Sequence, residues 1–443
     1  MTNTLTVIGG GLAGSEAAWQ AANAGVKVVL YEMRPTSTTP VHHTADFAEL
    51  VCSNSLKSNQ LTNAAGTLKE EMRRFNSLIV SAADKSRVPA GEALAVDRAM
   101  FAASISQALE GHPNIDIKRE EVISIDPTEH TIVATGPLTS SVLANSIADL
   151  TGQGQLFFYD AVAPTIDASS IDMEKIFVSS RYDKGDGGYI NCPLTKSEYE
   201  AFYSALSSAE LAPLHEYEAK TPYFEGCLPI EVLAARGPKT LSFGPMKPVG
   251  LEDPRTGRRP WAAVQLRQEN HAATMFSMVG FQTRMKWGEQ QRVFRMIPGL
   301  ENAEFVRFGV IHRNTYIKSP AVLQPSLNMN IHPRVFFAGQ ITGVEGYVES
   351  AATGILAGLN AARSIQKRDL MVLPNTTVLG ALADYVSAYN GKDFQPMNAN
   401  WGIVPPLDAS IKDKKVKAAS MSERALLALN PFTPNCPHYP QNA

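Results

Sequence analysis

"LTVIGGGLAGSEAAWQAANAGVKVVLYEMR" (Leu5–Arg34) contains, in order, a short apolar run, a glycine-rich turn, an alanine-rich run and a second apolar run. Short apolar runs bounded by turn residues predict buried β-strands. The alanine-rich run from Ser15 to Ala24 favours a helix, and Gly25 is a suitable residue for its end. The segment therefore predicts a strand–turn–helix–strand unit near the amino end of the chain.

The turn has the spacing Gly-x-Gly-x-x-Gly, which suits a dinucleotide. Gly9 allows a tight turn, Gly11 lets the backbone approach a pyrophosphate, and Gly14 lets the helix pack closely on the strand. The pyrophosphate would then meet free N–H groups at the positive end of the helix. Glu32 follows Gly14 by 18 residues, where a carboxylate can accept hydrogen bonds from a ribose diol. The expected cofactor-binding residues here are Gly9, Gly10, Gly11, Leu12, Ala13, Gly14 and Glu32.

Two later segments favour FAD over NAD, which the fingerprint alone does not separate. His130–Ser140 contains an apolar strand that ends at Thr135 and Gly136. Arg334–Ile365 contains a strand, a glycine-rich turn and a long helix of small residues. This order resembles the large FAD-binding family with a glutathione-reductase-like fold, although it also fits an ordinary β-α unit that completes a sheet. The resemblance implies that backbone amides of the last turn reach the flavin, from Gly339, Gln340 and Ile341.

The FAD-like segments lie at both ends of the chain, whose 443 residues suggest roughly two or three domains. We therefore predict an α/β fold: a glutathione-reductase-like, Rossmann-type FAD-binding domain, split in sequence, with an inserted α+β domain. The expected ranges are 1–170 and 315–443 for the two parts of the FAD-binding domain, and 171–314 for the insertion.

Within the insertion, Lys175–Leu194 predicts a hairpin, since two strand-like runs flank a Gly/Asp turn. Thr195 and Glu198 form a capping-box pattern at the start of a helix. Three aromatic residues fall on one face of that helix, and we interpret them as core residues rather than a base-stacking platform: Tyr199, Phe202 and Tyr203.

The chain has four cysteines without any C-x-x-C pair: Cys52, Cys192, Cys227 and Cys436. This spacing argues against a structural zinc site, a dithiol redox motif and a disulfide reductase, so no metal is expected. Few, scattered cysteines fit a reducing cytoplasm. The first apolar run has no basic leader before it, and no apolar run approaches the roughly 20 residues of a membrane-spanning helix. We therefore expect a cytoplasmic protein without a membrane partner.

The formal charge of −3 gives no global reason to expect nucleic-acid binding, so any such surface must be local. Ile411–Lys417 has four lysines against one aspartate. A charge run is usually a solvated face, but against a polyanion it would supply phosphate contacts. Other basic residues gather in the insertion: Arg255, Arg258, Arg259, Arg284, Lys286, Arg292, Arg295 and Arg307.

Five strings occur in one order: "LVCSNSLKS" (50–58), "TPYFEGCLPIEVLAARG" (221–237), "FGVIHRNTYI" (308–317), "FFAGQITGVEGYVESAATG" (336–354) and "FQPMNANWGIVPPL" (394–407). Together they closely resemble the folate- and FAD-dependent tRNA (uracil-5-)-methyltransferase family. The resemblance extends from Thr6 to past Leu407. Gln340 fits this family, although many other FAD-binding proteins have Asp at that position.

The resemblance implies methylation of C5 of a uracil in the T-loop of tRNA, at position 54. It also implies that the carbon comes from 5,10-methylenetetrahydrofolate, that reduced FAD turns the methylene into a methyl group, and that NAD(P)H reduces the flavin. The expected partners are the tRNA and these small molecules, with no obligate protein partner evident.

Such chemistry needs a thiolate that adds to C6 of uracil and a base that removes the C5 proton. By the resemblance, Cys227 matches the nucleophile, and Cys52 matches the base that also supports the flavin site. Cys192 receives no catalytic role, and Cys436 is interpreted as incidental. For folate we expect His312 to stack on the pterin, and Arg284 and Glu349 to bind its polar groups.

Other interpretations stay open at this point. One is a flavoprotein that modifies tRNA wobble uridines with a partner protein; that family is usually longer, with an extended C-terminal helical domain. Two others are a generic FAD oxidoreductase and a non-catalytic, flavin-bound tRNA-binding or folding helper.

Overall fold

A five-stranded parallel sheet with the strand order β16-β7-β1-β2-β6 is the first of two large sheets. The computed structural model describes residues 4–39, 41–154, 156–183, 188–213, 228–391, 394–408 and 410–433. Strands β7 and β16 are buried along their whole length, as expected for a sheet covered on both faces. The strands are β16 (Val335–Phe337), β7 (Thr131–Val133), β1 (Thr4–Ile8), β2 (Lys27–Tyr31) and β6 (Ile115–Lys118).

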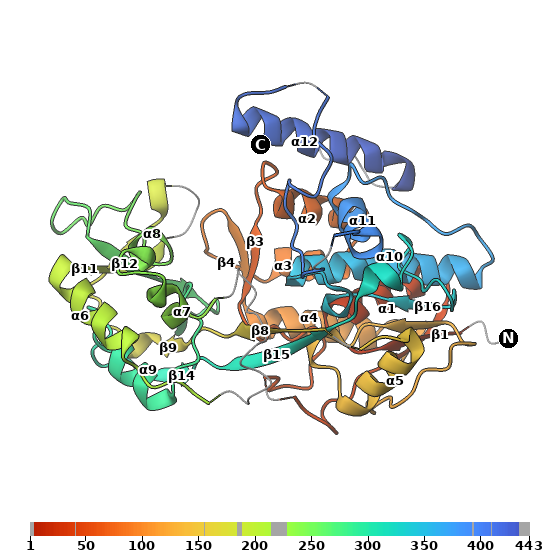
Figure 1. The fold of residues 1–443 in the computed structure, drawn as a ribbon, viewed down its shortest axis with the longest axis horizontal. Coiled ribbons are helices and arrows are strands. Elements are labelled where there is room, and N and C mark those ends of the chain that lie inside the picture. Colours follow the sequence, from red (N-terminus) through yellow and green to blue (C-terminus); the bar gives the residue numbers. More distant parts are fainter. Residues whose placement is uncertain are drawn as a thin grey trace.

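Helix α1 (Leu12–Asn23) follows β1, and helix α10 (Tyr347–Ile365) packs directly along it (Figure 1). The close approach requires glycine in α10. A Cβ on Gly354 would lie 2.3 Å from the carbonyl oxygen of Ala13, and one on Gly358 would lie 2.4 Å from that of Ala17. The small-residue pattern of "AATGILAGLNAA" therefore sets the distance between the two helices that support the glycine-rich turn.

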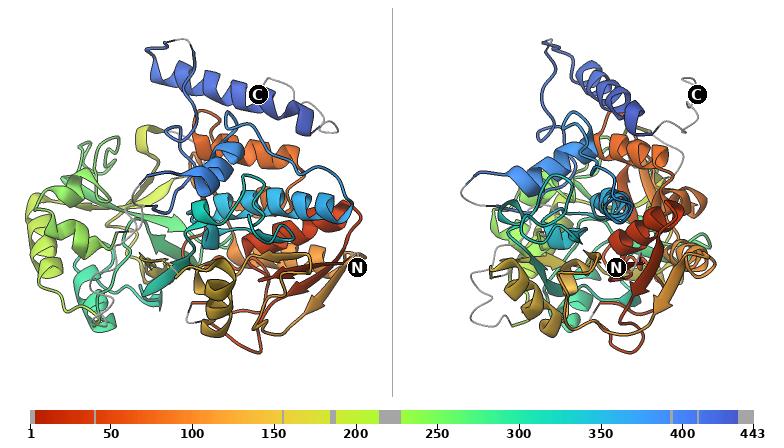
Figure 2. Two further views of the ribbon diagram at one scale, coloured as in Figure 1. Left: turned by 45° about the vertical axis from the view of Figure 1, so that its right-hand side comes forward. Right: turned by 90° about the vertical axis from the view of Figure 1, so that its right-hand side faces the viewer.

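The remaining helices of this half surround the first sheet and its helix pair, and α12 packs on the outer side of α2 (Figure 2). The contact between these two includes a hydrogen bond from Thr67 Oγ1 to Ser422 Oγ of 2.9 Å. A small three-stranded sheet, β3-β5-β4, lies beside them. The bounds are α2 (Ala64–Arg74), α3 (Leu78–Lys85), α4 (Arg98–Glu110), α5 (Ser141–Thr151), α11 (Val378–Ala388), α12 (Lys414–Leu429), β3 (Ser55–Ser58), β4 (Arg87–Val88) and β5 (Ala93–Val96).

The second large sheet has six strands in the order β10-β11-β12-β13-β9-β14, all antiparallel to their neighbours. It has its own apolar core, in which Phe202 and Phe281 are fully buried. Its strands are β9 (Thr165–Asp167), β10 (Phe177–Ser179), β11 (Tyr189–Leu194), β12 (Ala262–Gln268), β13 (Met275–Met278) and β14 (Phe305–Arg307). Its helices are α6 (Lys196–Ser207), α7 (Ile230–Ala235), α8 (Thr240–Phe243) and α9 (Trp287–Phe294).

The local predictions for this region are confirmed. Strands β10 and β11 pair antiparallel, and Thr195 and Glu198 form the capping box at the start of α6. On α6, Tyr199 and Phe202 are buried, and Tyr203 packs against the same core. These rings are therefore core residues and do not form a platform for bases.

Strands β8 (Leu156–Ala161) and β15 (Ile311–Tyr316) pair antiparallel and run between the two large sheets (Figure 1). The chain passes along β8 toward the six-stranded sheet and returns along β15 to β16 of the parallel sheet. The predicted α/β class is confirmed, with a Rossmann-type sheet built from both ends of the chain. The ranges 1–170, 171–314 and 315–443 stay a prediction.

In the part of the chain that the structure describes, no helix combines the length and apolar character needed to cross a membrane. Among the same residues, no three His, Cys, Asp or Glu side chains are grouped so that they could hold a metal ion.

Candidate functional site

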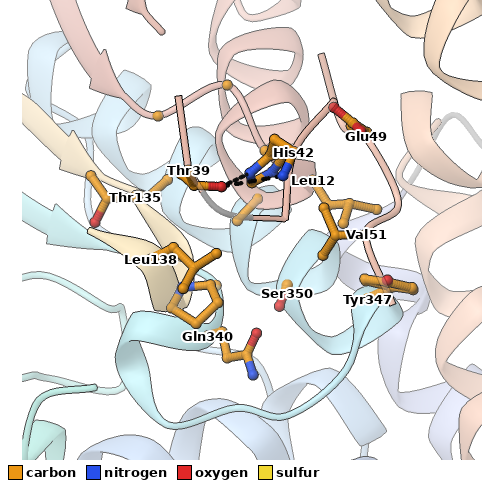
Figure 3. A pocket seen from close by; sticks show the side chains of 18 of the residues that line it. Leu12, Thr39, His42, Glu49, Val51, Thr135, Leu138, Gln340, Tyr347 and Ser350 are labelled. Carbon is orange, nitrogen blue, oxygen red and sulfur yellow. Dashed lines mark hydrogen bonds between the residues drawn. The ribbon is translucent and has the colours of Figure 1, made fainter. Parts of the chain in front are cut away.

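The carboxyl ends of β1, β7 and β16 open onto one cavity of about 400 Å³. In doubly wound sheets, ligands bind at this edge, where connections leave the sheet on both sides. Figure 3 shows side chains from three separated segments around the same space: Leu12, Thr39, His42, Glu49 and Val51 from the first, Thr135 and Leu138 from the second, and Gln340, Tyr347 and Ser350 from the third.

The glycine-rich turn forms one wall of this cavity. Gly9 has a φ of +101°, and a Cβ there would lie 2.6 Å from Ala134 O. A Cβ on Gly14 would lie 1.8 Å from Gly9 O, so any side chain would push the helix off the turn. A Cβ on Gly11 would meet no atom within 4 Å, and no side chain caps the N-terminus of α1. The backbone is thus open to a ligand where a pyrophosphate would bind.

Glu32 lies at the end of β2 and is held from two directions. Its Oε1 accepts from the backbone N–H and Nε of Arg34 at 3.0 and 2.9 Å, and its Oε2 accepts from the Gly10 N–H at 2.8 Å. Burial alone would raise the pKa of Glu32, but the hydrogen bonds and charge of Arg34 and the amide of Gly10 bring the pKa below its ordinary value. The charged Oε2 keeps acceptor capacity for a ribose hydroxyl.

The residues predicted to hold the cofactor converge on this cavity. All of them line it except Gly14 and Ile341, which are buried behind the lining and support it by packing. An extended cavity with an uncapped helix N-terminus at one wall and a buried carboxylate beside it fits FAD.

Cys52 lines the same cavity and is half-buried. The phenol oxygen of Tyr347, at the start of α10, accepts from the backbone N–H groups of Cys52 at 2.7 Å and Ser53 at 3.2 Å. Burial raises the pKa of Tyr347, which therefore stays neutral. Cys192 lies in β11 with no exposed surface, and burial raises its pKa far above the range of a reactive thiol. Cys52 thus borders the cavity, whereas Cys192 is enclosed in the protein core.

Cys227 and Cys436 lie outside the described residues. The described chain resumes at Leu228, and Ile230 donates its N–H to Gln282 O at 2.7 Å. Gln282 lines the cavity that Cys52 also lines. The segment that follows Cys227 in sequence is therefore tied to a wall of this cavity.

Two of the three residues predicted to bind folate, Arg284 and Glu349, do not line this cavity. Arg284 lines a second cavity, together with Trp287. Glu349 is fully buried, and its Oε1 accepts from Lys57 Nζ at 2.6 Å and from the Ala399 N–H at 2.9 Å. His312 lies in β15, but its side chain is outside the described residues. These assignments stay predictions.

Lys57 is a cavity residue that the sequence analysis missed. It lies in β3 with a φ of +64°, and this bend directs its ammonium to Glu349. The lysine was visible in "LVCSNSLKS", but nothing in the sequence paired it with a carboxylate 292 residues later. Tyr347 and Gln282 were missed for the same reason, because their roles depend on tertiary contacts.

Lys69 stabilises β3 through hydrogen bonds from its side chain. Its ammonium is fully buried and donates to the carbonyls of Leu56, Ser58 and Ala65 at 2.8, 2.7 and 3.0 Å. Lys69→Met would leave buried carbonyls without a partner, so we expect the free energy of unfolding to fall by about 2–4 kcal/mol. Denaturant unfolding measures this, with the exposed Lys85→Met as a control expected to change it by less than about 0.5 kcal/mol. Equal losses in the two variants would contradict the role of Lys69.

His42 forms a hydrogen bond of 2.6 Å between its Nδ1 and Thr39 Oγ1 at the cavity (Figure 3). Burial, followed by the charge of Arg34, lowers the pKa of His42 to about 4. Below pH 6.5 the unfolded chain binds a proton that the native state does not, so stability should fall as the pH drops from about 6.5 to 4. In His42→Asn we expect the free energy of unfolding to fall by about 1–3 kcal/mol less over this pH range than in the wild type. Thermal unfolding across this pH range measures it, and an unchanged slope would contradict a neutral, half-buried His42.

Known proteins resemble this chain in both sequence and fold. The family model described as "Glucose inhibited division protein A" matches residues 4–369. A methylenetetrahydrofolate–tRNA-(uracil-5-)-methyltransferase TrmFO of Anoxybacillus flavithermus is 60% identical over 428 residues, which cover 97% of this chain and 99% of the relative. The TrmFO of Halalkalibacterium halodurans is 58% identical over 431 residues, with the same coverage of both chains.

The chain belongs to the TrmFO family. Among solved structures, GidA of Aquifex aeolicus superposes with a TM-score of 0.70 at 18% identity, and the match covers 98% of this chain and 73% of that one. At this identity the likeness shows the fold alone. Three of the five strings quoted from the sequence contribute residues to the cavity lining, among them Cys52, Tyr347 and Asn398, and the Cys52 N–H donates to the Tyr347 phenol oxygen.

Proposed function

We propose that this protein methylates C5 of a uracil in the T-loop of tRNA, at position 54, with 5,10-methylenetetrahydrofolate as the carbon donor. The observation that carries the proposal is the identity of 58–60% with proteins named for this activity, along 97% of the chain. The cavity supports it, because a glycine-lined FAD site and a half-buried cysteine share one space. FAD and a folate are thus the cofactors that the family and the site support together.

The proposed roles of the cysteines follow from the chemistry of uracil. Cys227 adds to C6 and makes C5 nucleophilic, and Cys52 then takes the C5 proton. Bound, reduced FAD would supply the electrons that convert the methylene to a methyl group. We propose His312, Arg284 and Glu349 as folate contacts. Gln282 is two residues from Arg284 and lines the FAD cavity, which supports a folate site along this segment.

We further propose NAD(P)H as the reductant, a cytoplasmic location and action without an obligate protein partner. The tRNA would bind as a polyanion along exposed basic surface. Lys414, Lys415 and Lys417 at the start of α12 are exposed, as are Arg258 and Arg259. Others are already paired, since Lys286 contacts Glu210 at 2.7 Å and Arg292 contacts Glu289 at 2.6 Å.

The test is an incubation of the protein with unmodified tRNA, methylenetetrahydrofolate and NADPH or NADH, followed by nucleoside analysis. We expect 5-methyluridine only when tRNA, folate and reductant are all present. Product that forms only with S-adenosylmethionine would contradict the proposal. A modified wobble uridine, or flavin oxidation without any tRNA product, would support the corresponding alternative instead.

A further inference from the structure

The loop Leu50–Asn54, called here the Cys52 loop, is held by three arginines that come from both halves of the fold. Arg98 is the first residue of α4, next to the parallel sheet. Arg267 and Arg307 belong to β12 and β14 of the six-stranded sheet. The two halves of the molecule therefore meet at the loop that carries Cys52.

Each guanidinium makes a separate contact with this loop. Arg98 donates from Nη1 to Leu50 O at 2.6 Å and from Nη2 to Cys52 O at 3.4 Å. Arg307 donates from Nη1 to Val51 O at 3.1 Å. Arg267 donates from Nη2 to Ser53 Oγ and from Nε to Asn54 Oδ1, both at 2.7 Å.

Tyr347 completes the set by accepting from the N–H groups of Cys52 and Ser53. Both the carbonyl and the amide of Cys52 are thus occupied by side chains from outside the loop. A rigid arginine fork limits the positions that a loop can adopt, so these contacts fix where the Cys52 sulfur lies in the cavity.

The charges around the loop do not cancel. Glu269 is a buried carboxylate that pairs with Arg98 at 2.6 Å. Of the described groups in contact with the loop, Arg98, Arg267 and Arg307 are cationic and Tyr347 is neutral. Burial lowers the pKa of Arg267 and Arg307, and a negative charge on Cys52 acts in the opposite direction on both and on Arg98, so the attraction is mutual.

The charged groups farther along the cavity include pairs and also further acidic side chains, among them Glu120 and Glu121. Lys57 contacts Glu349, and Glu49, the residue before the Cys52 loop, contacts Arg34 at 3.0 Å. Glu345, which also lines the cavity, accepts from Gln340. Among the described residues at the loop itself, however, three arginines stand against one carboxylate, Glu269, which pairs with Arg98, so the immediate surroundings of Cys52 are positive and favour a thiolate.

We propose that Arg98, Arg267 and Arg307 are positioning residues that fix the Cys52 sulfur in the cavity and favour its thiolate form. This rests on the proposed role of Cys52 as the base. In that step the S–H bond forms and the C5–H bond of uracil breaks. The electron pair of the broken bond becomes the second bond between C5 and the one-carbon unit already attached to it, as the donor amine of the folate leaves. The inserted sheet thus takes part in proton removal through two arginines.

The test measures alkylation of Cys52 by iodoacetamide as a function of pH in the FAD-loaded protein, with the Cys52 peptide followed by mass spectrometry. In the wild type we expect a midpoint clearly below the ordinary thiol value of about 8.5. In Arg267→Met the midpoint should rise by about one pH unit. At a pH below both midpoints, this corresponds to about tenfold less thiolate than in the wild type. Arg267→Lys keeps the positive charge, so its midpoint should lie close to that of the wild type. Arg292→Met on α9, whose arginine pairs with Glu289, is the matched control and should leave it unchanged.

Arg307→Met is the second variant, and it should raise the midpoint in the same direction even if Arg267→Met fails to fold. Midpoints equal to the wild type in the folded, FAD-loaded methionine variants would overturn the proposal, as would Arg267→Lys behaving like Arg267→Met. If the proposed methylation is wrong but the arginines act on Cys52 as proposed, the midpoint still shifts in these variants and the protein makes no 5-methyluridine.

Discussion

Gly14→Ala is expected to lose bound FAD. The new Cβ would lie 1.8 Å from the carbonyl oxygen of Gly9, a distance at which two unbonded atoms cannot coexist. The Cβ is fixed by the backbone of α1 and the oxygen belongs to the backbone of the turn, so neither can rotate away and α1 would have to move off the turn. Overpacking of this kind costs typically about 1–3 kcal/mol or more. The N–H groups at the start of α1 would leave the position that a pyrophosphate needs, and we expect affinity for FAD to fall at least about tenfold.

The measurement is the flavin absorbance per mole of purified protein, together with the midpoint of thermal unfolding with and without added FAD. Gly288→Ala is the matched control, because a Cβ at this helical position in α9 would meet no atom within 4 Å. It should keep full FAD content. Gly14→Ala with full FAD content and an unchanged unfolding midpoint would show that the glycine-rich turn does not hold the cofactor as described.

Cys227→Ala is expected to abolish methylation and the covalent trapping of RNA that contains 5-fluorouracil. Fluorine at C5 blocks removal of the C5 substituent, so a thiolate that has added to C6 stays attached. Without the nucleophile no adduct can form, and we expect activity to fall by at least about a hundredfold. Gel mobility under denaturing conditions detects the adduct.

Cys52→Ala separates the two proposed roles. It should be inactive, since a general base contributes about a hundredfold or more, but it should still form the adduct. Cys192→Ala serves as the control with both functions intact, because Cys192 is buried in β11, away from the cavity lining. An adduct in Cys227→Ala would show that the nucleophile is wrongly assigned. Loss of the adduct in Cys52→Ala with FAD still bound would exchange the two roles.

Local sequence patterns predicted the elements that depend on neighbours in the chain. The turn from Gly9 to Gly14 and the helix after it were readable because the glycine spacing is a local pattern, in which Gly14 packs against the carbonyl of Gly9. The capping box of α6 and the β10–β11 hairpin were readable for the same reason. The alanine-rich run predicted a helix from Ser15, whereas α1 already begins at Leu12, because the glycine-rich turn continues directly into the helix.

Contacts between distant segments were not readable. Arg307 belonged to a set interpreted as solvated or phosphate-binding charge and Arg267 was not singled out, but the structure turns both toward the Cys52 loop. Lys57 reaches Glu349 through a left-handed backbone conformation that the residue types in this segment do not predict. Arg284 and Glu349 were grouped by chemical type, and the fold places one at a second cavity and buries the other. A resemblance to a family assigns residues to a reaction, but tertiary structure decides which of them lie together.

The most direct test of the proposed activity traces the carbon. The protein is incubated with unmodified tRNA, NADPH, unlabelled S-adenosylmethionine and methylenetetrahydrofolate that carries ¹³C in its methylene group, and the mass of 5-methyluridine is then measured. We predict that the ¹³C appears in the methyl group at C5, and that omission of tRNA or reductant prevents product formation. An unlabelled methyl group, or no 5-methyluridine from FAD-loaded protein with all components present, would contradict the account.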